Sequence, residues 1–490
     1  MYFPSKGKIS KFASKGCLIP VYKEIKTSQD PSAIFSALSR GKHSFLLESA
    51  RTHPKIGRYS FLGADPFIVF KSKADKIEVS RGGNVEKSSG NPFEKLRDIL
   101  NKYKSAKVPG LPNFTGGAVG YFGYDSCHFF EELPRNAKDD LNLPDLYFGI
   151  YDTILAFDHF KDKTIIISNV FPGENIKKSY DNAVKKIEQL EKEILKAANT
   201  LQTPELTSGN GKKIKIESNF TRSGFEKIVT KAKQYIKQGD IYQANLSQRL
   251  SISTKADPRK LYKKLQEINP SPFSCMLDFD GLAIVSSSPE RLLKLENGYV
   301  ETRPIAGTRP RGKTNRMDKE FSRRLLLSPK ERAEHIMLVD LERNDLGRVC
   351  EYGTVRVNEK MVLEKYSHVT HIVSNICGKL RKDKDRFDLI AAVFPGGTIT
   401  GTPKIRCMEI IDELEPVARN IYTGSIGYLG FNGDMDLNIA IRTFIIKGNK
   451  AYVQVGAGIV ADSDPTREYR ETLHKAEALV CAIKKVASSQ

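Results

Sequence analysis

The sequence lacks several features that would place it in a functional class at once. It has no run of about 18 apolar residues, the length a membrane-spanning helix needs, and its first residues lack the apolar core of a signal peptide. Its 7 cysteines are scattered without a CxxC pair, which is typical of reduced thiols in the cytoplasm. The nucleotide-binding fingerprints GxGxxG after a strand and GxxxxGKS or GxxxxGKT are absent. We therefore expect a cytoplasmic protein without a membrane segment.

Basic residues outnumber acidic ones. Lys and Arg number 78 and Asp and Glu 58, a formal net charge of +20, in a chain of 490 residues that is 40% hydrophobic. This composition is typical of a soluble globular protein, and the charge suits anionic small molecules, acidic partner surfaces or nucleic acid. A nucleic-acid-binding protein would gather Lys and Arg with aromatic residues on one face, whereas Lys is spread along this chain. We expect no nucleic-acid partner.

One break in composition divides the chain. Apolar residues recur with a 3.6-residue period over 180–195, which predicts a helix, and a Thr-, Asn-, Gly- and Pro-rich segment follows it. We therefore predict an N-terminal part over 1–198, a linker over 199–216 and a C-terminal part over 217–490.

The two parts contain a faint repeat. Residues 114–123 (FTGGAVGYFG) resemble residues 422–430 (YTGSIGYLG) when one gap is allowed. Helical patterns precede them at 93–103 and 404–414, and a strand–turn–strand pattern and a long helix follow each. We predict that the two parts are related sheet-plus-helix units with the same strand order.

Two carboxylates open a predicted buried helix. Ser328 suits the N-cap and Pro329 the first turn, and Glu331 and Glu334 lie roughly 60° apart on the helix. Because a carboxylate that faces a core is costly unless it is paired or bound to metal, this pair is a candidate ligand set. Alternatively, Ser328 and Glu331 form a capping box.

A second pair of carboxylates opens the last predicted helix. Glu468 and Glu471 flank its apolar stripe, and Lys475 follows Glu471 at the spacing of a surface ion pair, which is the simpler interpretation. The two helix openings could converge on one hard cation, and Mg²⁺ prefers few carboxylates together with water and an anionic substrate.

Arg442 lies in a segment of alternating polarity, 437–444, which predicts a strand with Arg442 on the face of Asn438 and Ala440. It could form a structural ion pair or a bidentate clamp on a carboxylate.

The Gly- and Thr-rich loop 394–404 enters a helix and could favour anions. His368 and His371 lack a third ligand nearby, so zinc is disfavoured and buried, hydrogen-bonded histidines are expected.

Several segments, in order along nearly the whole chain, resemble the chorismate-utilising enzymes, and among them the large subunit of anthranilate synthase. These segments are 46–49 (LLES), 57–60 (GRYS), 240–249 (DIYQANLSQR), 288–291 (SPER) and 303–312 (RPIAGTRPRG), together with the Glu-, Gly- and Arg-containing segments above. The resemblance implies an α+β fold of large antiparallel sheets packed together with helices outside.

The resemblance also implies a set of site residues. The expected Mg²⁺ ligands are Glu331, Glu334, Glu468 and Glu471. The expected substrate-binding residues are Gly307, Thr308, Thr398, Tyr422, Arg442, Gly456, Gly458 and Lys475. Glu290 would be the general acid that protonates the departing C4 hydroxyl of chorismate, with a pKa raised by the substrate carboxylates, and His371 would assist the later loss of pyruvate.

Two positions distinguish members of the resembled family. Isochorismate-forming relatives have a lysine that activates water where this chain has Gln243, an amide that cannot act as a base. Many aminodeoxychorismate synthases have a nucleophilic lysine in PIKGT where this chain has Ala306. Direct addition of ammonia and elimination of pyruvate would then give anthranilate. The alternative is the large subunit of aminodeoxychorismate synthase.

The resemblance extends to regulation and to a partner. Ser49, Arg58, Pro272, Phe273 and Ser274 are expected to bind L-tryptophan as a feedback inhibitor. Residues 273–275 (FSC) depart from the usual inhibitor motif, however, and look closer to aminodeoxychorismate synthases. Since the chain has no glutaminase nucleophile motif, ammonia is expected from a separate glutamine amidotransferase subunit.

Overall fold

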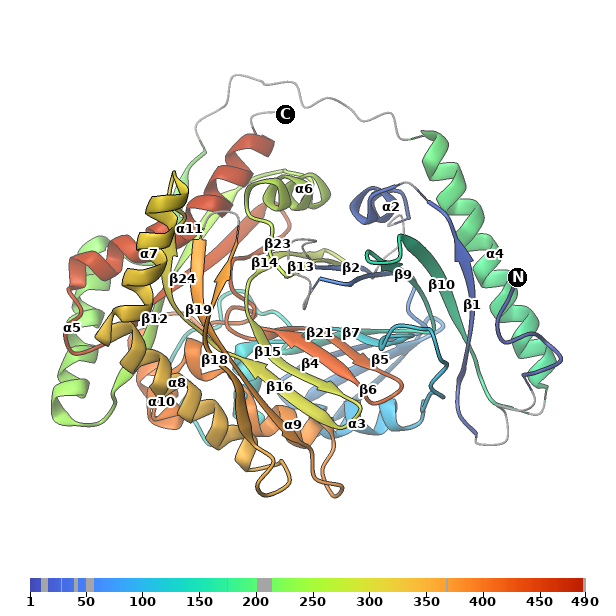
Figure 1. The fold of residues 1–490 in the computed structure, drawn as a ribbon, viewed down its shortest axis with the longest axis horizontal. Coiled ribbons are helices and arrows are strands. Elements are labelled where there is room, and N and C mark those ends of the chain that lie inside the picture. The colour runs from blue at the N-terminus through green and yellow to red at the C-terminus, as the bar shows by residue number, and fades with distance from the viewer. Residues whose placement is uncertain are drawn as a thin grey trace.

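Two large antiparallel sheets lie one above the other with helices on their outer faces and edges (Figure 1). The computed structural model describes residues 1–9, 16–27, 29–38, 43–49, 57–173, 175–200, 214–366 and 369–487. The predicted α+β fold of packed antiparallel sheets is confirmed. The predicted linker falls largely outside these residues, since α4 (Ile176–Thr200) ends and β11 (Ile216–Ser218) begins on either side of a gap.

Both sheets have 12 described strands. The first has the order β1 (Ile19–Ile25), β10 (Lys163–Val170), β9 (Thr153–Asp158), β3 (Tyr59–Gly63), β2 (Ser44–Glu48), β13 (Phe273–Phe279), β14 (Leu282–Ser288), β23 (Thr443–Lys447), β24 (Lys450–Ile459), β12 (Gln243–Ser253) and β11, with β20 (Gly401–Thr402) beside β12. The second has the order β17 (Ile305–Pro310), β19 (Val369–Lys379), β16 (Tyr299–Arg303), β15 (Arg291–Glu296), β22 (Met435–Asn438), β21 (Ser425–Gly430), β7 (Gly117–Phe122), β8 (Leu146–Tyr151), β4 (Ile68–Lys73), β5 (Lys76–Arg81) and β6 (Asn84–Ser89), with β18 (Arg356–Lys365) beside β19.

The remaining elements are helical. They are α2 (Pro31–Leu38), α3 (Pro92–Asn101), α5 (Arg222–Gln238), α6 (Pro258–Ile268), α7 (Asn315–Leu327), α8 (Pro329–Gly347), α9 (Arg386–Val393), α10 (Lys404–Leu414), α11 (Pro465–Ala487) and the 3₁₀ turns η1 (Tyr124–Phe129) and η2 (Gly397–Ile399). In the described part of the chain, no helix is long and apolar enough to cross a membrane.

The predicted relation between the two halves is confirmed by the strand order. From the middle of the first sheet outward, β2, β3, β9, β10 and β1 correspond to β13, β14, β23, β24 and β12. In the second sheet, β7 and β21 pair with each other at the middle, followed by β8, β4 and β5 on one side and β22, β15 and β16 on the other. Each sheet therefore contains strands from both halves.

The second half differs from the first by an insertion. Between β16 and α10 it adds β17, α7, α8, β18, β19 and α9, for which the first half has only β6 between β5 and α3. The added α8 begins as predicted, because Pro329 opens the helix and the Ser328 hydroxyl accepts the Glu331 amide at 3.4 Å. The insertion thus brings two of the predicted metal-ligand carboxylates to only one of the two related halves.

The hydrophobic core has several layers. Between the sheets lie aromatic side chains, including Phe45 and Tyr151, whose ring centroids are 4.7 Å apart. A second layer lies between the first sheet and the helices outside it, where α4 contributes Ile187 and α11 contributes Leu479 and Ile483. This burial explains the 3.6-residue apolar period of both long helices.

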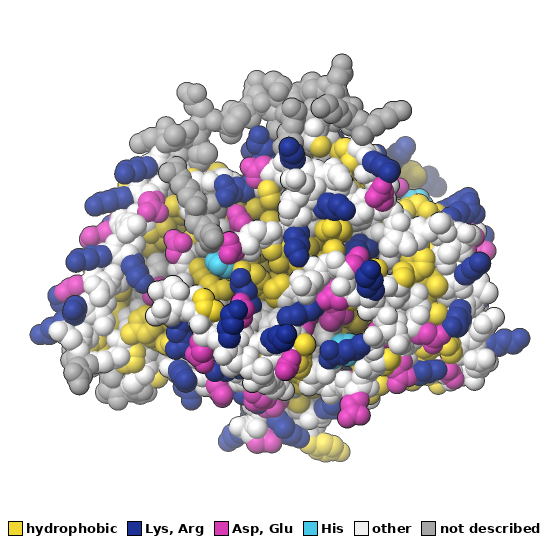
Figure 2. Space-filling model, turned by 180° about the vertical axis from the view of Figure 1, so that it is seen from behind, with side chains coloured by type: hydrophobic (Ala, Val, Ile, Leu, Met, Phe, Trp, Pro, Cys, Tyr) yellow, Lys and Arg dark blue, Asp and Glu magenta, His cyan; other side chains and the backbone are white. Residues whose placement is uncertain are grey.

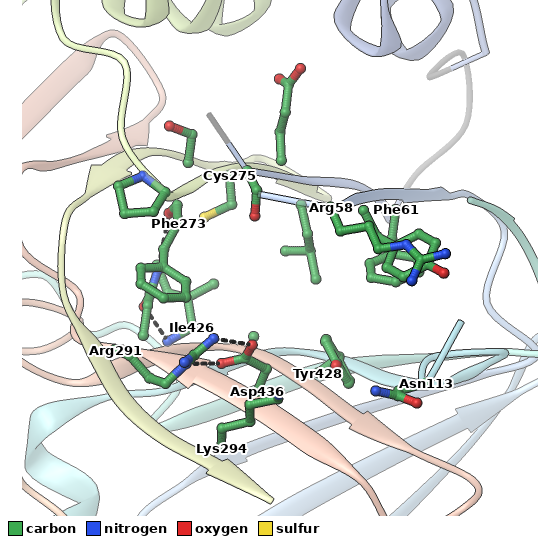
Figure 3. A pocket seen from close by; sticks show the side chains of 18 of the residues that line it. Arg58, Phe61, Asn113, Phe273, Cys275, Arg291, Lys294, Ile426, Tyr428 and Asp436 are labelled. Carbon is green, nitrogen blue, oxygen red and sulfur yellow. Dashed lines mark hydrogen bonds and ion pairs between the residues drawn. The ribbon is translucent and has the colours of Figure 1, made fainter. Parts of the chain in front are cut away.

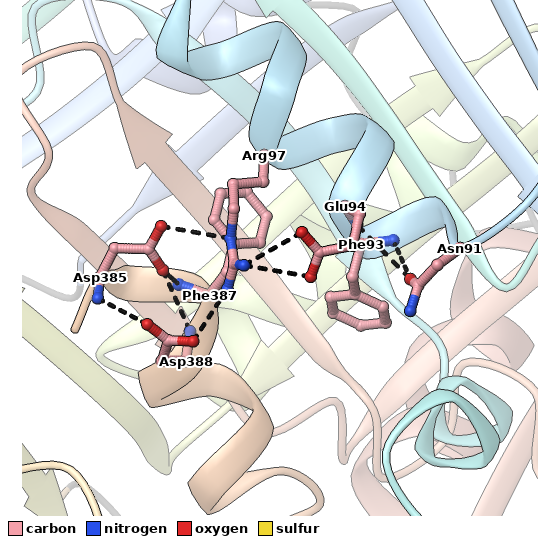
Figure 4. A network of polar contacts seen from close by, with 7 residues as sticks. All are labelled: Asn91, Phe93, Glu94, Arg97, Asp385, Phe387 and Asp388. Carbon is pink, nitrogen blue, oxygen red and sulfur yellow. Dashed lines mark hydrogen bonds and ion pairs between the residues drawn. The ribbon is translucent and has the colours of Figure 1, made fainter. Parts of the chain in front are cut away.

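Arg97 links helices of the two halves (Figure 4). Its guanidinium on α3 forms ion pairs with Glu94 on the same helix and with Asp385 and Asp388 at the start of α9, at 3.0 to 3.2 Å. Asp385 and Asp388 also form a capping box for α9. The network therefore fixes the position of α9 against the first half.

The predicted strand through Arg442 is wrong. The chain leaves the second sheet after Asn438 and enters the first sheet at Thr443, and Arg442 lies in the crossing with φ +50°. The Ile439 amide donates to the Glu290 carbonyl, outside either strand ladder. The alternating sequence spans two sheets, so Arg442 does not share a strand face with Asn438 and Ala440. Hairpin turns at Asn432 and Gly448 join β21 to β22 and β23 to β24.

Basic and acidic side chains are mixed on one face of the described part of the chain (Figure 2). On the face turned away from the viewer in Figure 1, Lys and Arg lie among Asp and Glu (Figure 2). Ion pairs at the surface include Lys330 with Asp462 at 3.0 Å and Arg324 with Glu320 at 2.7 Å.

Candidate active site

The opening turns of α8 and α11 lie close to each other and to the start of β12. Gln243 on β12 donates from Nε2 to Glu334 Oε1 on α8 at 3.0 Å. Burial raises the pKa of Glu334, and the charges of Glu331 and of Glu471 on α11 raise it further. Burial likewise raises the pKa of Glu468, with Glu471 adding to the effect. The carboxylates from both helix openings therefore act on one another.

The donor chemistry of these four carboxylates suits a hard divalent cation. They supply only oxygen ligands, and their mutual repulsion is what a cation between them would relieve. Two of them have cationic partners, since Arg309 lies 3.2 Å from Glu331 and Lys475 lies 2.9 Å from Glu471. Among the described residues, no three Asp, Glu, His or Cys groups are close enough to form a ready metal site. The structure gathers the ligands in one region without closing a cage.

Glu290 is a buried acid on the inner side of this region. Its side chain follows β14, is 5% exposed and accepts the Ile305 amide at 3.3 Å. Burial raises the pKa of Glu290 to about 7, although the Ile305 amide and the nearby Thr398, Arg442 and Lys475 oppose the shift. A carboxyl with this pKa can hold and release a proton near neutral pH.

His371 on β19 lies on the same side of the site. Its Nδ1 is 2.8 Å from the Thr308 hydroxyl on β17. Burial lowers the pKa of His371 to about 4, and the charge of Arg442 lowers it further, so the ring is neutral at pH 7. Its Nε2 is buried and has no hydrogen-bond partner among the described residues, which leaves it available to a bound molecule. His368 lies outside the described residues.

Glycines let the backbone come close to the polar side chains. A Cβ at Gly458 would lie 2.6 Å from Gln243 Nε2, and a Cβ at Gly456 would lie 2.7 Å from Tyr422 Oη. The Lys475 ammonium donates to the Gly456 carbonyl at 2.9 Å, which joins α11 to β24. A side chain at Gly458 would displace Gln243, and a side chain at Gly456 would displace Tyr422.

Gly307 is constrained in two ways. Its φ of +66° favours glycine, and a Cβ there would lie 2.8 Å from Glu331 Oε2. The predicted site residues therefore lie together in one region of the molecule. They come from β12, β17, β19, β24, α8, α11 and the segments around Glu290, Thr398, Tyr422 and Arg442.

One acidic residue of this region was not singled out from the sequence. Glu342 lies on the buried face of α8, and its pKa is affected by the charge of Glu290. Its signal in the sequence is a carboxylate eight residues after Glu334, which places it near the same side of the helix among apolar residues.

A separate cavity of about 300 Å³ opens between the two sheets at the middle of the molecule (Figure 3). It is lined by β2 and β13 of the first sheet and by β21, β22 and β15 of the second. All five predicted inhibitor-binding residues line it: Ser49, Arg58, Pro272, Phe273 and Ser274. Its charged wall includes Arg291, which donates to both oxygens of Asp436 at 3.0 and 3.1 Å, and Arg58, which binds Asp158 at 2.9 Å.

Comparison with known proteins decides the family. The sequence model of the chorismate binding enzymes matches residues 42–480. The chain belongs to this family. The chain is thus a chorismate-utilising enzyme, and two layered antiparallel sheets with a Glu-rich site are the family's fold in this molecule.

Individual relatives refine the comparison. The anthranilate synthase component 1 of Acetivibrio thermocellus is 46% identical over 487 residues, which cover 99% of each chain. The aminodeoxychorismate synthase component 1 of Bacillus subtilis is 44% identical over 442 residues, 90% of this chain and 92% of that one. The crystal structure of anthranilate synthase component I from Streptococcus pneumoniae matches with a TM-score of 0.76 and 36% identity, covering 88% of this chain and 93% of that one. The resemblance to the large subunit of anthranilate synthase is confirmed.

Proposed function

We propose that this chain converts chorismate and ammonia into anthranilate and pyruvate. The observation that carries the proposal is the absence of an amine or base at two positions beside the site. Gln243, whose amide donates to Glu334, cannot activate water, and Ala306 cannot attack the ring. Ammonia is itself a nucleophile, so its addition to the ring needs neither a base that activates water nor an attacking lysine.

Proton transfer from Glu290 starts the reaction. The acid form of Glu290 protonates the C4 hydroxyl of chorismate, which leaves as water when the C4–O bond breaks. Ammonia then adds at the ring carbon beside the carboxylate. The raised pKa of Glu290, about 7, keeps enough of the acid form for this step near neutral pH.

Loss of pyruvate completes the reaction. Neutral His371 accepts a proton in this step, because its Nδ1 is held by the Thr308 hydroxyl and its Nε2 is free to face the bound intermediate. The proton comes from C2, the ring carbon that carries the new amino group, and its bonding electrons form the C2–C3 double bond as the C3–O bond to the enolpyruvyl group breaks. Enolpyruvate leaves and takes up a proton at its methylene carbon to become pyruvate, and the ring becomes aromatic.

The site would orient a substrate with two carboxylates. Tyr422, Arg442 and the strand around Gly456 and Gly458 would hold the enolpyruvyl carboxylate. Gly307, Thr308 and Thr398 would line the ring, and Lys475 would stand near the ring carboxylate. Glu331, Glu334, Glu468 and Glu471 would hold Mg²⁺, which when bound neutralises the ring carboxylate and orients it.

The same proposal includes a partner and a regulator. A separate glutamine amidotransferase subunit would supply ammonia, as the designation component 1 of the relatives suggests. L-Tryptophan would bind in the cavity lined by Ser49, Arg58 and Phe273 and inhibit the enzyme. We place the enzyme in the cytoplasm and in tryptophan biosynthesis.

A second function, synthesis of aminodeoxychorismate, is favoured by a specific observation. The Bacillus subtilis relative that bears this name is 44% identical to this chain, against 46% for the anthranilate synthase component 1 of Acetivibrio thermocellus, and residues 273–275 of the cavity wall look closer to that enzyme class. It would leave the amino group at C4 and keep the enolpyruvyl arm.

One assay separates the two products. The purified chain is incubated with chorismate, Mg²⁺ and ammonium, and the products are followed by fluorescence and mass. We expect fluorescent anthranilate and pyruvate to form without an added lyase. A product that retains the enolpyruvyl group would support the second function instead.

A further inference from the structure

Arg419 and Glu415 form a buried ion pair that no step of the proposed reaction uses. The side chain of Arg419 is 1% exposed and that of Glu415 is 2% exposed. Both residues follow α10, and Glu415 is the C-cap of that helix. Replacing a buried ion pair by apolar residues of similar shape is often neutral for stability, because both charges of the pair lose contact with water. Stability of the fold alone therefore does not account for this pair.

Every N–H donor of the Arg419 guanidinium has an acceptor. Nε and Nη2 donate to the two carboxylate oxygens of Glu415 at 2.9 and 2.6 Å. Nη2 also donates to the Asn245 carbonyl at 2.6 Å. Nη1 donates to the Ile399 carbonyl at 2.9 Å and to the Thr423 hydroxyl at 3.3 Å. A guanidinium has five such hydrogens in a rigid plane, and all five are used here.

Two of these contacts hold segments that carry predicted substrate-binding residues. Ile399, whose carbonyl accepts from Arg419, directly follows Thr398 in η2. Thr423, whose hydroxyl accepts, directly follows Tyr422, and the centre of the Tyr422 ring lies 5.5 Å from the guanidinium carbon. Arg419 therefore links the segment of Thr398 to the segment of Tyr422.

The ion pair also holds β12 near its first residue, Gln243. Arg419 donates to the carbonyl of Asn245 on this strand. Glu415 Oε1 accepts both the amide and the hydroxyl of Ser247, each at 2.8 Å. Both members of the pair thus bind the end of β12 that brings the Gln243 amide to the candidate active site.

We propose that Arg419, oriented by Glu415, is a positioning residue that keeps Tyr422, Thr398 and the start of β12 in the arrangement that binds chorismate. Arg419 acts through these neighbours and not by contact with the substrate. Because one planar group with five donors joins three segments, a side chain with fewer donors would release at least one of them. The inference rests on the proposed function, since it takes Tyr422 and Thr398 as substrate-binding residues.

The test is the dissociation constant for chorismate in two variants that keep the charges, Arg419→Lys and Glu415→Asp. Lysine has three donors in place of five, and aspartate is one methylene too short for the same bidentate contact. Isothermal titration calorimetry with chorismate and Mg²⁺ in buffer without ammonia measures binding without formation of anthranilate. The dissociation constant should rise about tenfold in each variant, because displaced side chains lose part of their contact with the substrate.

The matched control is Arg249→Lys. Arg249 is another buried arginine with a carboxylate partner, Asp140, and it lies farther along β12 from Gln243. This variant should keep the dissociation constant of the parent, because Arg249 has no bond to the segments of Tyr422 or Thr398 among its hydrogen bonds.

A lower melting temperature with an unchanged dissociation constant in folded Arg419→Lys and Glu415→Asp would overturn the proposal, since the pair would then serve the fold alone. Failure of both variants to fold would overturn it in the same way. If the parent forms a product other than anthranilate, the proposed function fails, while the dissociation constants for chorismate still decide the inference.

Discussion

At the scale of single residues, burial turns ordinary side chains into an acid and a base. Glu290 and His371 both lose contact with water, and burial shifts their pKa values in opposite directions because it disfavours the charged form of each. The result is a carboxyl that is protonated in part and an imidazole that is neutral at the same pH. The proposed reaction needs this combination.

The pH profile of kcat/KM should therefore be bell-shaped. Activity should fall as pH rises through about 7, where Glu290 loses its proton, and fall below about 4, where His371 gains one. Initial rates from pH 3 to 9 with saturating ammonia would measure it, after correction for the ionisation of ammonium. Glu290→Gln should abolish turnover throughout, and a normal alkaline limb in that variant would remove Glu290 from the role of acid.

Glu334→Gln should reduce turnover about 100-fold or more while the protein stays folded. Glutamine keeps the shape but not the charge expected to bind Mg²⁺. The pKa of Glu334 is raised in the folded protein, so its ionised form opposes folding above its unfolded pKa, and the variant should melt at the same or a higher temperature. Glu320→Gln, on the exposed part of α7, is the control. Full activity of Glu334→Gln would exclude Glu334 from the metal site.

At the scale of elements, the relation between α3 and α9 depends on one side chain. Arg97 forms ion pairs with three carboxylates. Such a network stabilises the fold more than an isolated surface pair does, because one ordered guanidinium binds several partners. The cavity between the sheets is likewise made by elements, since β2 and β13 of different halves meet at its wall.

Arg97→Met should lower the free energy of unfolding by about 1–2 kcal/mol, because Asp385 and Asp388 lose their shared cation. Urea unfolding followed by far-UV circular dichroism would measure the change. Lys95→Met, also on α3, removes a more exposed ion pair with Glu86 on β6 and should have a much smaller effect. Equal changes in the free energy of unfolding for the two substitutions would show that the Arg97 network adds no stability beyond that of an ordinary surface ion pair.

Ser49→Ala tests the cavity. If L-tryptophan binds there, loss of one hydroxyl contact should raise the concentration for half-inhibition by about tenfold and leave uninhibited turnover intact. Inhibition curves for the parent, Ser49→Ala and Ser36→Ala on α2 would show it. Unchanged inhibition in Ser49→Ala would reject Ser49 as a contact.

At the scale of the whole molecule, two related halves share both sheets but only one carries the candidate active site. The insertion of α7 and α8 supplies Glu331, Glu334 and Glu342 to the second half. The cavity with the predicted inhibitor residues lies where the halves meet, so both halves contribute to it. This arrangement gives the molecule one candidate active site and a separate central cavity.

The chain alone should use ammonium but not glutamine. We expect anthranilate with chorismate, Mg²⁺ and ammonium, and none when glutamine replaces ammonium, because no nucleophile for glutamine hydrolysis was found in the sequence. Mass spectrometry of both reactions checks this, and addition of a matching amidotransferase subunit should restore use of glutamine. Glutamine-dependent turnover by the isolated chain would contradict the expected partner.

The sequence by itself determined the family, the beginning of the helix at Pro329 and the relation between the two halves. Ser328 and Pro329 begin a helix, and Gly448 lies in a hairpin turn. Both features depend on residues only a few positions away, and these can be read directly from the sequence. The tertiary structure alone decided where Arg442 lies, because an alternating pattern reads the same whether it spans one sheet or two. It also decided that the charge of Glu290 raises the pKa of Glu342, since such an effect depends on the distance between segments far apart in the chain.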